Sequence, residues 1–140
     1  MDEKSIRLIR ESFAQVAALA SPAAILFYGR LFHLDPSARE IFAQPDKRAQ
    51  GAQFIAVLDY AVAMLDQLDR LLPLARILAR RHAARGLRPE HYGAMGEALD
   101  WMLAECLAED YSPELRLAWK RAYNTLASEM MKEAYRAQAA

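Results

Sequence analysis

The sequence of 140 residues is poor in cysteine, with Cys106 as its single example, and it has only three histidines. One cysteine cannot form an intramolecular disulfide, which excludes a secreted domain held together by disulfides and indicates a reducing compartment, the cytoplasm. The histidines and the cysteine lie far apart in the sequence, so the usual zinc site with four nitrogen and sulfur ligands is excluded as well. A cofactor site that needs only one protein ligand stays open.

The chain also lacks an excess of charge and a long uninterrupted apolar run. Its 18 Lys and Arg residues balance 18 Asp and Glu residues, so the basic surface that binding to a phosphate backbone requires is missing. The start of the chain does not have the basic-then-apolar order of a signal peptide, and Pro22 and Arg30 interrupt the most apolar stretch. We expect no nucleic-acid partner and no membrane span.

Residues that favour β-strands are scarce. The chain has ten β-branched residues (six Ile, three Val and one Thr) against 28 Ala and 19 Leu, a composition that favours α-helix throughout. With 54% hydrophobic and 26% charged residues, a chain of this length can bury a real core and corresponds to one domain. The sequence therefore predicts an all-α fold with a single domain over residues 1–140.

Apolar residues spaced three and four apart, together with proline and glycine, divide the chain into seven or eight helices. Ser21, Asp35 and Ser112 each precede a proline, as a capping residue does when proline occupies the first helical turn. Pro73 must lie in the first turn of its helix or mark a bend, and Gly86 ends that helix. Helices of unequal length joined by short turns predict an obliquely packed helical sandwich rather than a four-helix bundle. The first helix is expected over about 2–19, the second from the Ser21 cap to about residue 34, and a short third segment from Asp35-Pro36 to about residue 42. After a loop over 43–48, a helix through Phe54 ends at about residue 66, the next is centred on 74–84, and the last two begin at Pro89 and at Ser112-Pro113 and run through Leu107 and Met130.

Single residues do not identify a site in this sequence. His82, near a helix end, is explained as an exposed or satisfied histidine that the helix dipole favours. His33 and His91 are equally well explained as structural residues. Tyr28 alone is most simply a core aromatic whose hydroxyl bonds elsewhere. Evidence for a function has to come from a combination of positions.

Such a combination extends along nearly the whole chain, from about Ile6 to Glu133. Its members are Phe27-Tyr28-Gly29-Arg30-Leu31-Phe32, Asp35-Pro36, Phe42, Gln50 with Phe54, Arg81-His82, Gly86, His91-Tyr92, Ala118-Trp119 and Tyr123. In order and spacing this set resembles the globin family, and within it the single-domain bacterial haemoglobins and the globin half of flavohaemoglobins. The resemblance implies a globin fold, with seven to eight helices packed obliquely around a haem pocket.

The resemblance places His82 at the position of the proximal histidine, which would make it the ligand of the haem iron. No Cys-x-x-Cys-His motif occurs, so we expect a non-covalent haem b (iron protoporphyrin IX). Phe42 matches the ring that globins press against the haem, although any core phenylalanine would look the same alone. Arg81 is expected either to reach a haem propionate or simply to be solvated.

The resemblance places Tyr28, Gln50 and Phe54 on the distal side of the haem. Gln50 and Phe54 are four residues apart and share one helix face, and Tyr28 approaches from the second helix. A phenol O–H and an amide N–H stabilise the partial negative charge of bound O₂ in a dry pocket. Because Gln50 is a poor iron ligand, the iron is expected to be five-coordinate at rest. The small residues Ala24 and Gly51 fit a close helix crossing.

In the resembled bacterial proteins, a tyrosine ten residues after the proximal histidine and a glutamate in the last helix bond near the imidazole and give it imidazolate character. Tyr92 stands ten residues after His82. Glu133 is the candidate carboxylate, although its spacing from Trp119 is one residue short of the flavohaemoglobin pattern, and Glu129 is a second candidate. A glutamate near a C-terminus is otherwise usually a solvated surface residue.

The function that the resemblance implies is reversible binding of O₂, NO and CO, in oxygen transport or in NO detoxification by NO dioxygenation. The chain has no Gly-x-Gly-x-x-Gly motif, so an NAD(P)H-dependent reductase in trans would have to supply electrons, and an enzymatic role stays open. One alternative is a haem-based sensor or partner-docking domain, which would not need His82, Tyr28 and Gln50 together. Another is a weak peroxidase, although the distal histidine and arginine of efficient peroxidases are missing.

Overall fold

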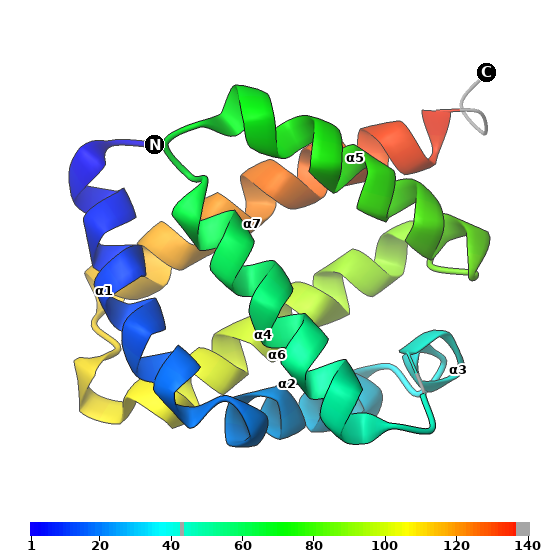
Figure 1. Ribbon diagram of the computed structural model, residues 1–140, viewed down its shortest axis with the longest axis horizontal. Helices are drawn as coiled ribbons and strands as arrows, with labels where there is room; N and C mark the ends of the chain where they lie inside the picture. The colour runs from blue at the N-terminus through cyan, green and yellow to red at the C-terminus, as the bar shows by residue number, and fades with distance from the viewer. Residues whose placement is uncertain (43, 137–140) are drawn as a thin grey trace.

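The computed structural model describes residues 1–42 and 44–136, and the regular structure in this part of the chain is entirely helical. The all-α prediction is therefore confirmed (Figure 1). The helices are α1 (Glu3–Leu19), α2 (Ser21–Leu34), α3 (Ala38–Phe42), α4 (Lys47–Ala63), α5 (Leu68–Ala84), α6 (Pro89–Leu107) and α7 (Pro113–Ala134), with a 3-10 turn, η1 (Ala108–Asp110), between the last two.

Side-chain caps begin three of the helices. Asp2, Asp46 and Ser112 each accept a hydrogen bond from the backbone N–H three residues further along, at 2.7, 3.1 and 3.1 Å. These bonds satisfy N–H groups that the first turns of α1, α4 and α7 would otherwise leave free. At Ser112 the bond confirms the predicted cap before Pro113.

The prediction that Ser21 caps α2 is wrong. Ser21 is already the first residue of the helix, and Ala20 before it has a φ of +48° and makes no side-chain hydrogen bond. Because α1 ends at Leu19, a single residue turns the chain by 98° between the two helices. This tight corner leaves no extended residue for the usual capping geometry.

Other helix boundaries also differ from the prediction: α3 begins at Ala38 rather than at Asp35-Pro36, and α4 ends at Ala63 rather than near Asp66. α4 begins at Lys47, inside the stretch predicted as a loop; Ala43, also in that stretch, lies outside the described residues. α5 begins at Leu68, so Pro73 lies in its second turn rather than its first. The side chain of Leu71 is only 4% exposed, and its burial stabilises the additional turn.

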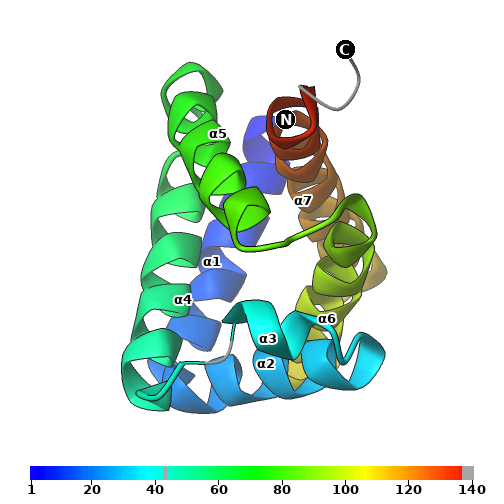
Figure 2. The same cartoon turned by 90° about the vertical axis from the view of Figure 1, so that its right-hand side faces the viewer.

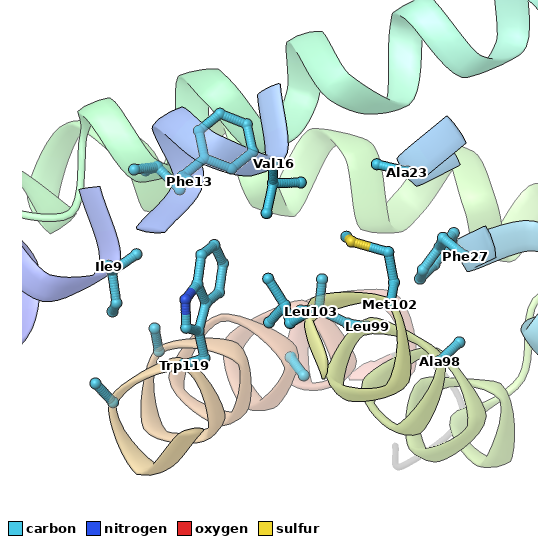
Figure 3. Packing of buried hydrophobic residues seen from close by; sticks show 14 of the residues in the cluster. Ile9, Phe13, Val16, Ala23, Phe27, Ala98, Leu99, Met102, Leu103 and Trp119 are labelled. Atoms are coloured by element: carbon cyan, nitrogen blue, oxygen red, sulfur yellow. The ribbon is translucent and has the colours of Figure 1, made fainter. Parts of the chain in front are cut away.

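The core lies between α1, α6 and α7, with α2 at one end (Figure 3). Ile9 of α1 and Met102 and Leu103 of α6 are at most 1% exposed. The indole N–H of Trp119 from α7 donates to Ser12 Oγ at 2.9 Å, so its one polar group is satisfied inside the core. These residues are thus covered by other side chains of the protein.

Helices α4 and α5 stand beside this core (Figures 1 and 2). α4 packs on α1 and α2, α5 packs on α7, and α4 and α5 have no extensive contact with each other in the described residues. At the crossing of α2 and α4, a Cβ added at Gly51 would lie 3.2 Å from the Ala24 Cβ, which confirms the predicted close crossing. The two helices therefore form walls that do not meet.

No single helix among the described residues is long and apolar enough to cross a membrane. Only α1 and α2 taken together satisfy that test, and they are bent by 98° relative to each other. Their apolar side chains, among them Ile9, Val16 and Leu31, pack in the core.

Candidate functional site

A cleft of about 630 Å³ lies between α4 and α5, and its volume is within the usual range for small-molecule and cofactor sites. Apolar and aromatic side chains from α2 to α7 supply most of its lining. Of the eight candidate site residues, the structure brings seven to the cleft and leaves Glu133 outside it. The seven are Tyr28, Phe42, Gln50, Phe54, Arg81, His82 and Tyr92.

His82 lines the cleft from the C-terminal part of α5. Phe42 of α3 meets its ring edge-on, with ring centroids 5.4 Å apart and planes at 77°. Burial lowers the pKa of His82 below the ordinary value of 6.5, and the positive charge of Arg85 lowers it further. The imidazole is therefore neutral near pH 7, which is the form that binds a metal ion.

Two buried polar atoms of cleft-lining residues have no hydrogen-bond partner among the described residues, namely His82 Nδ1 and the Tyr92 hydroxyl. Tyr92 is 3% exposed, and burial raises its pKa to about 12, so the hydroxyl keeps its proton. Buried polar groups in proteins are nearly always paired. Two orphaned groups beside one cleft indicate that it holds a partner that the polypeptide does not supply.

The side of the cleft formed by α2 and α4 carries Tyr28, Gln50 and Phe54. Burial raises the pKa of the Tyr28 hydroxyl, and a hydrogen bond with the Gln50 side chain partly offsets this effect, so the phenol stays protonated. The Gln50 amide N–H also donates to the Phe42 carbonyl. The Phe54 ring lies 5.5 Å from the Tyr28 ring and stacks on Phe27 at 4.2 Å. This side thus presents a phenol and an amide within an aromatic surface.

Glu133 and Glu129 of α7 have other partners than the resemblance implies. The Glu133 carboxylate is paired with Arg80 of α5 and with Arg136, which follows the end of α7. Glu129 is paired with another arginine of α5 at 3.2 Å. Within the described residues, neither carboxylate forms a hydrogen bond or ion pair with His82 or Tyr92. In the described residues, Arg80 of the packed helix α5 and Arg136 are the partners of Glu133 instead.

The cleft also contains Arg85 and Gln53, which the sequence patterns did not single out. Arg85 follows His82 by three residues and Arg81 by four, so helical spacing places all three on one face. Gln53 stands three residues after Gln50 in the same way. Periodicity around the candidate residues could therefore have found both.

The other two histidines do not line the cleft. His91 is 1% exposed, its Nδ1 accepts a hydrogen bond from the Arg88 N–H at 2.8 Å, and its Nε2 lies 2.8 Å from Ser37 Oγ. With both ring nitrogens engaged, His91 is a satisfied structural histidine. Among the described residues, His82 is the single histidine in the cleft.

These features fit the haem that the resemblance implies. A neutral imidazole is the usual protein ligand of a globin haem. The apolar walls suit a porphyrin, and Arg81 and Arg85 provide positive charge for its carboxylates. The orphaned Nδ1 shows that no protein group already occupies this part of the His82 ring.

The profile of the Globin family matches residues 25–130. The chain belongs to the globin family. This globin is 30% identical over 145 residues to a neuroglobin of Danio rerio, with 94% of the chain and 91% of the relative covered. It is 27% identical over 129 residues to a flavohemoprotein of Bacillus subtilis (strain 168), with 91% of the chain but 32% of the relative covered. The chain thus spans about a third of the length of that flavohemoprotein.

A solved structure supports the globin fold. The hexacoordinated heme protein of an anhydrobiotic tardigrade matches this globin with a TM-score of 0.83 at 16% identity, over 96% of the chain and 95% of that protein. The predicted globin fold is confirmed. Membership of the family implies a haem and the binding of diatomic gases.

Proposed function

We propose that this globin, a single domain over residues 1–140, holds a non-covalent haem b in the cleft and binds O₂, NO and CO reversibly. The observation that carries the proposal is His82, a neutral imidazole in an apolar cleft that no other described histidine lines. When bound, the haem supplies the iron chemistry of ligand binding and electron transfer. The polypeptide supplies the iron ligand, the packing and the hydrogen-bond donors.

Several cleft residues have roles in holding the haem in this proposal. Phe42 and Phe54 pack against the porphyrin, and Arg81, with Arg85 beside it, pairs with the propionates. The Tyr92 hydroxyl and His82 Nδ1, which have no partner among the described residues, share a bridging water in this proposal, because a buried polar group is stable only when paired.

Tyr28, supported by Gln50, provides the donor for the gaseous ligand. Burial keeps the Tyr28 phenol protonated, so its O–H can donate. Gln50 has two amide protons, of which one donates to the Phe42 carbonyl and the other interacts with the Tyr28 oxygen, so the Tyr28 O–H is the donor left for the ligand and Gln50 supports it. A ligand that carries partial negative charge is therefore stabilised more strongly than an uncharged one such as CO.

The iron is five-coordinate at rest in this proposal. Gln50 is a weak iron ligand, and His33 and His91 do not line the cleft. The tardigrade protein is described as hexacoordinated, so coordination number is a point on which this globin and that structural neighbour are expected to differ.

The physiological chemistry that we propose is NO dioxygenation, in which NO, O₂ and one electron give nitrate. Support comes from the match of 91% of the chain to a flavohemoprotein. One electron is needed in each turnover, and we assign its delivery to a separate NAD(P)H-dependent reductase. With Cys106 as its single cysteine, the protein is suited to the reducing cytoplasm, where such a reductase would operate.

Absorption spectra test the haem assignment. We expect the purified protein to show a Soret band when oxidised, the bands of five-coordinate haem when reduced, and a shifted band with CO. His82→Ala should abolish the reduced spectrum, and added imidazole should restore it. His91→Ala is the matched control and should leave the spectrum unchanged. Absence of a Soret band after haem reconstitution, or loss of the spectrum in His91→Ala alone, contradicts the assignment.

A further inference from the structure

The helix that carries His82 is held in the fold mainly by α7. α5 packs closely on α7 and has no other extensive helix contact in the described residues, because the cleft separates it from α4 (Figure 2). The interactions that set the position of α5 on α7 therefore also set the position of His82 in the cleft.

Two ion pairs, here called the ion-pair ladder, join α5 to α7 one helical turn apart. Arg76 lies 3.2 Å from the Glu129 carboxylate, and Arg80 is paired with Glu133. The hydrogen bond from Arg76 lowers the pKa of Glu129, so this pair is charged at neutral pH. If the next residue of α5 took the place of each residue that now faces α7, the arginines would turn by about 100° around the helix axis and away from the glutamates. Both pairs can therefore form together in only one register.

The ladder also takes up the charge of Glu133. Arg136 lies 3.0 Å from Glu133 Oε2 while Arg80 binds Oε1, so two guanidinium groups share a carboxylate that is only 15% exposed. Glu114, in a surface pair with Lys4, is 62% exposed by comparison. A carboxylate neutralised by two arginines lends little negative charge to a more distant imidazole.

We propose that Glu129 and Glu133 are positioning residues that hold α5 in one register on α7 and thereby hold His82 in its place in the cleft. Their action on His82 is mechanical, through the α5 backbone, rather than electronic, through charge delivered to the imidazole. Arg80 stands two residues before His82, so a displacement at this pair moves the histidine with it. The part that concerns the iron rests on the proposed function, whereas the ladder itself does not.

Hydrogen exchange of the α5 amides in the full chain tests the ladder without haem. Glu133→Gln and Arg80→Gln should each raise the α5 exchange rates by a similar factor, about two- to fivefold. The double variant should add little, because either change alone breaks the pair. In the charge-swapped double variant, Arg80→Glu with Glu133→Arg, the α5 exchange rates should be lower than in Arg80→Glu alone. Glu114→Gln is the control and should leave α5 unchanged. Exchange in α5 that responds to neither Glu133→Gln nor Arg80→Gln would overturn the proposal.

Resonance Raman spectra of the haem-loaded protein separate mechanical from electronic action. If the action is mechanical, Glu133→Gln and Arg80→Gln alter the iron–histidine stretching band in the same way. If it is electronic, loss of the Glu133 charge lowers the frequency, whereas loss of Arg80 frees that charge and raises it. Opposite shifts therefore refute the proposal. If even the wild-type chain takes up no haem, the proposed function fails, while hydrogen exchange still decides the ladder.

Discussion

The closed side of the molecule, where α1, α6 and α7 meet (Figure 3), differs from the open side, between α4 and α5, in what covers its apolar residues. On the closed side, Ile9 and Met102 are fully buried by neighbouring side chains. On the open side, Val57, Tyr60 and Leu74 line the cleft and are 42, 44 and 47% exposed. The closed side therefore stabilises the fold, and the open side presents apolar surface that a ligand has to cover.

Buried polar groups also differ between the two sides, because they are paired on the closed side and unpaired on the open side. Trp119 donates to Ser12 Oγ on the closed side. On the open side, His82 Nδ1 and the Tyr92 hydroxyl are buried without a partner among the described residues. An unpaired buried polar group costs about 1–3 kcal/mol. This cost applies to two groups of the open side, and both belong to residues that line the cleft of the proposed haem.

The largest contrast in stability should separate Met102→Ala from Val57→Ala. Met102 is fully buried on the closed side, and its truncation should lower the free energy of unfolding by about 2–5 kcal/mol. Val57 is 42% exposed in the cleft, and its truncation should change that free energy by less than about 0.5 kcal/mol. Urea unfolding of the haem-free protein measures both, and equal losses would remove the distinction between the two sides.

Tyr28→Phe should change ligand release from the open side. If the hydroxyl donates to bound O₂, its removal deletes a charge-assisted hydrogen bond of about 1.5–3 kcal/mol, so O₂ dissociation should accelerate by about one to two orders of magnitude. CO dissociation should respond much less. Gln50→Leu should act in the same direction, and the double variant should be non-additive. Equal effects on O₂ and CO, measured by stopped flow, would mean that Tyr28 acts by its bulk.

Gly96→Ala tests the packing of α6 against α7 beside the cleft. An added Cβ would lie 2.7 Å from the ring of Tyr123, whose hydroxyl donates to the Tyr92 carbonyl. The variant should lose about 1–3 kcal/mol through overpacking. Gly93 has nothing within 4 Å of an added Cβ, so Gly93→Ala should instead gain up to about 1 kcal/mol. Thermal unfolding compares the two, and a stabilised Gly96→Ala would show that the Tyr123 ring is free to move.

The smallest expected effect is a pH dependence from His82. Its pKa is lowered by burial in the folded protein, so just below pH 6.5 the unfolded state binds protons more readily than the folded state. The stability of the haem-free protein should therefore fall as the pH drops from 6.5 toward the folded pKa, with no contribution from this group above 6.5. His82→Gln should flatten the dependence. Parallel curves for the two proteins in urea titrations would show that His82 is not desolvated.

The members of the site could be predicted from the resemblance to globins, whereas helical spacing by itself only placed some of them on a common helix face. Gln50 and Phe54 share one turn of α4, and Arg81 and His82 lie near the end of α5, where the structure also finds them. Ser21 shows the limit of such reasoning. Its sequence favours a cap, but the 98° corner between α1 and α2 places it inside the helix.

The sequence by itself determined the helical class and the starts of α1, α6 and α7, because helices are stabilised by interactions over three or four residues. It also contains the set of residues that resembles a globin. The tertiary structure decided that Glu133 pairs with Arg80, and that the Tyr92 hydroxyl is left without a partner in the described residues. Arg80 and Glu133 are 53 residues apart in the chain. Their contact depends on how two whole helices pack, which no local pattern contains.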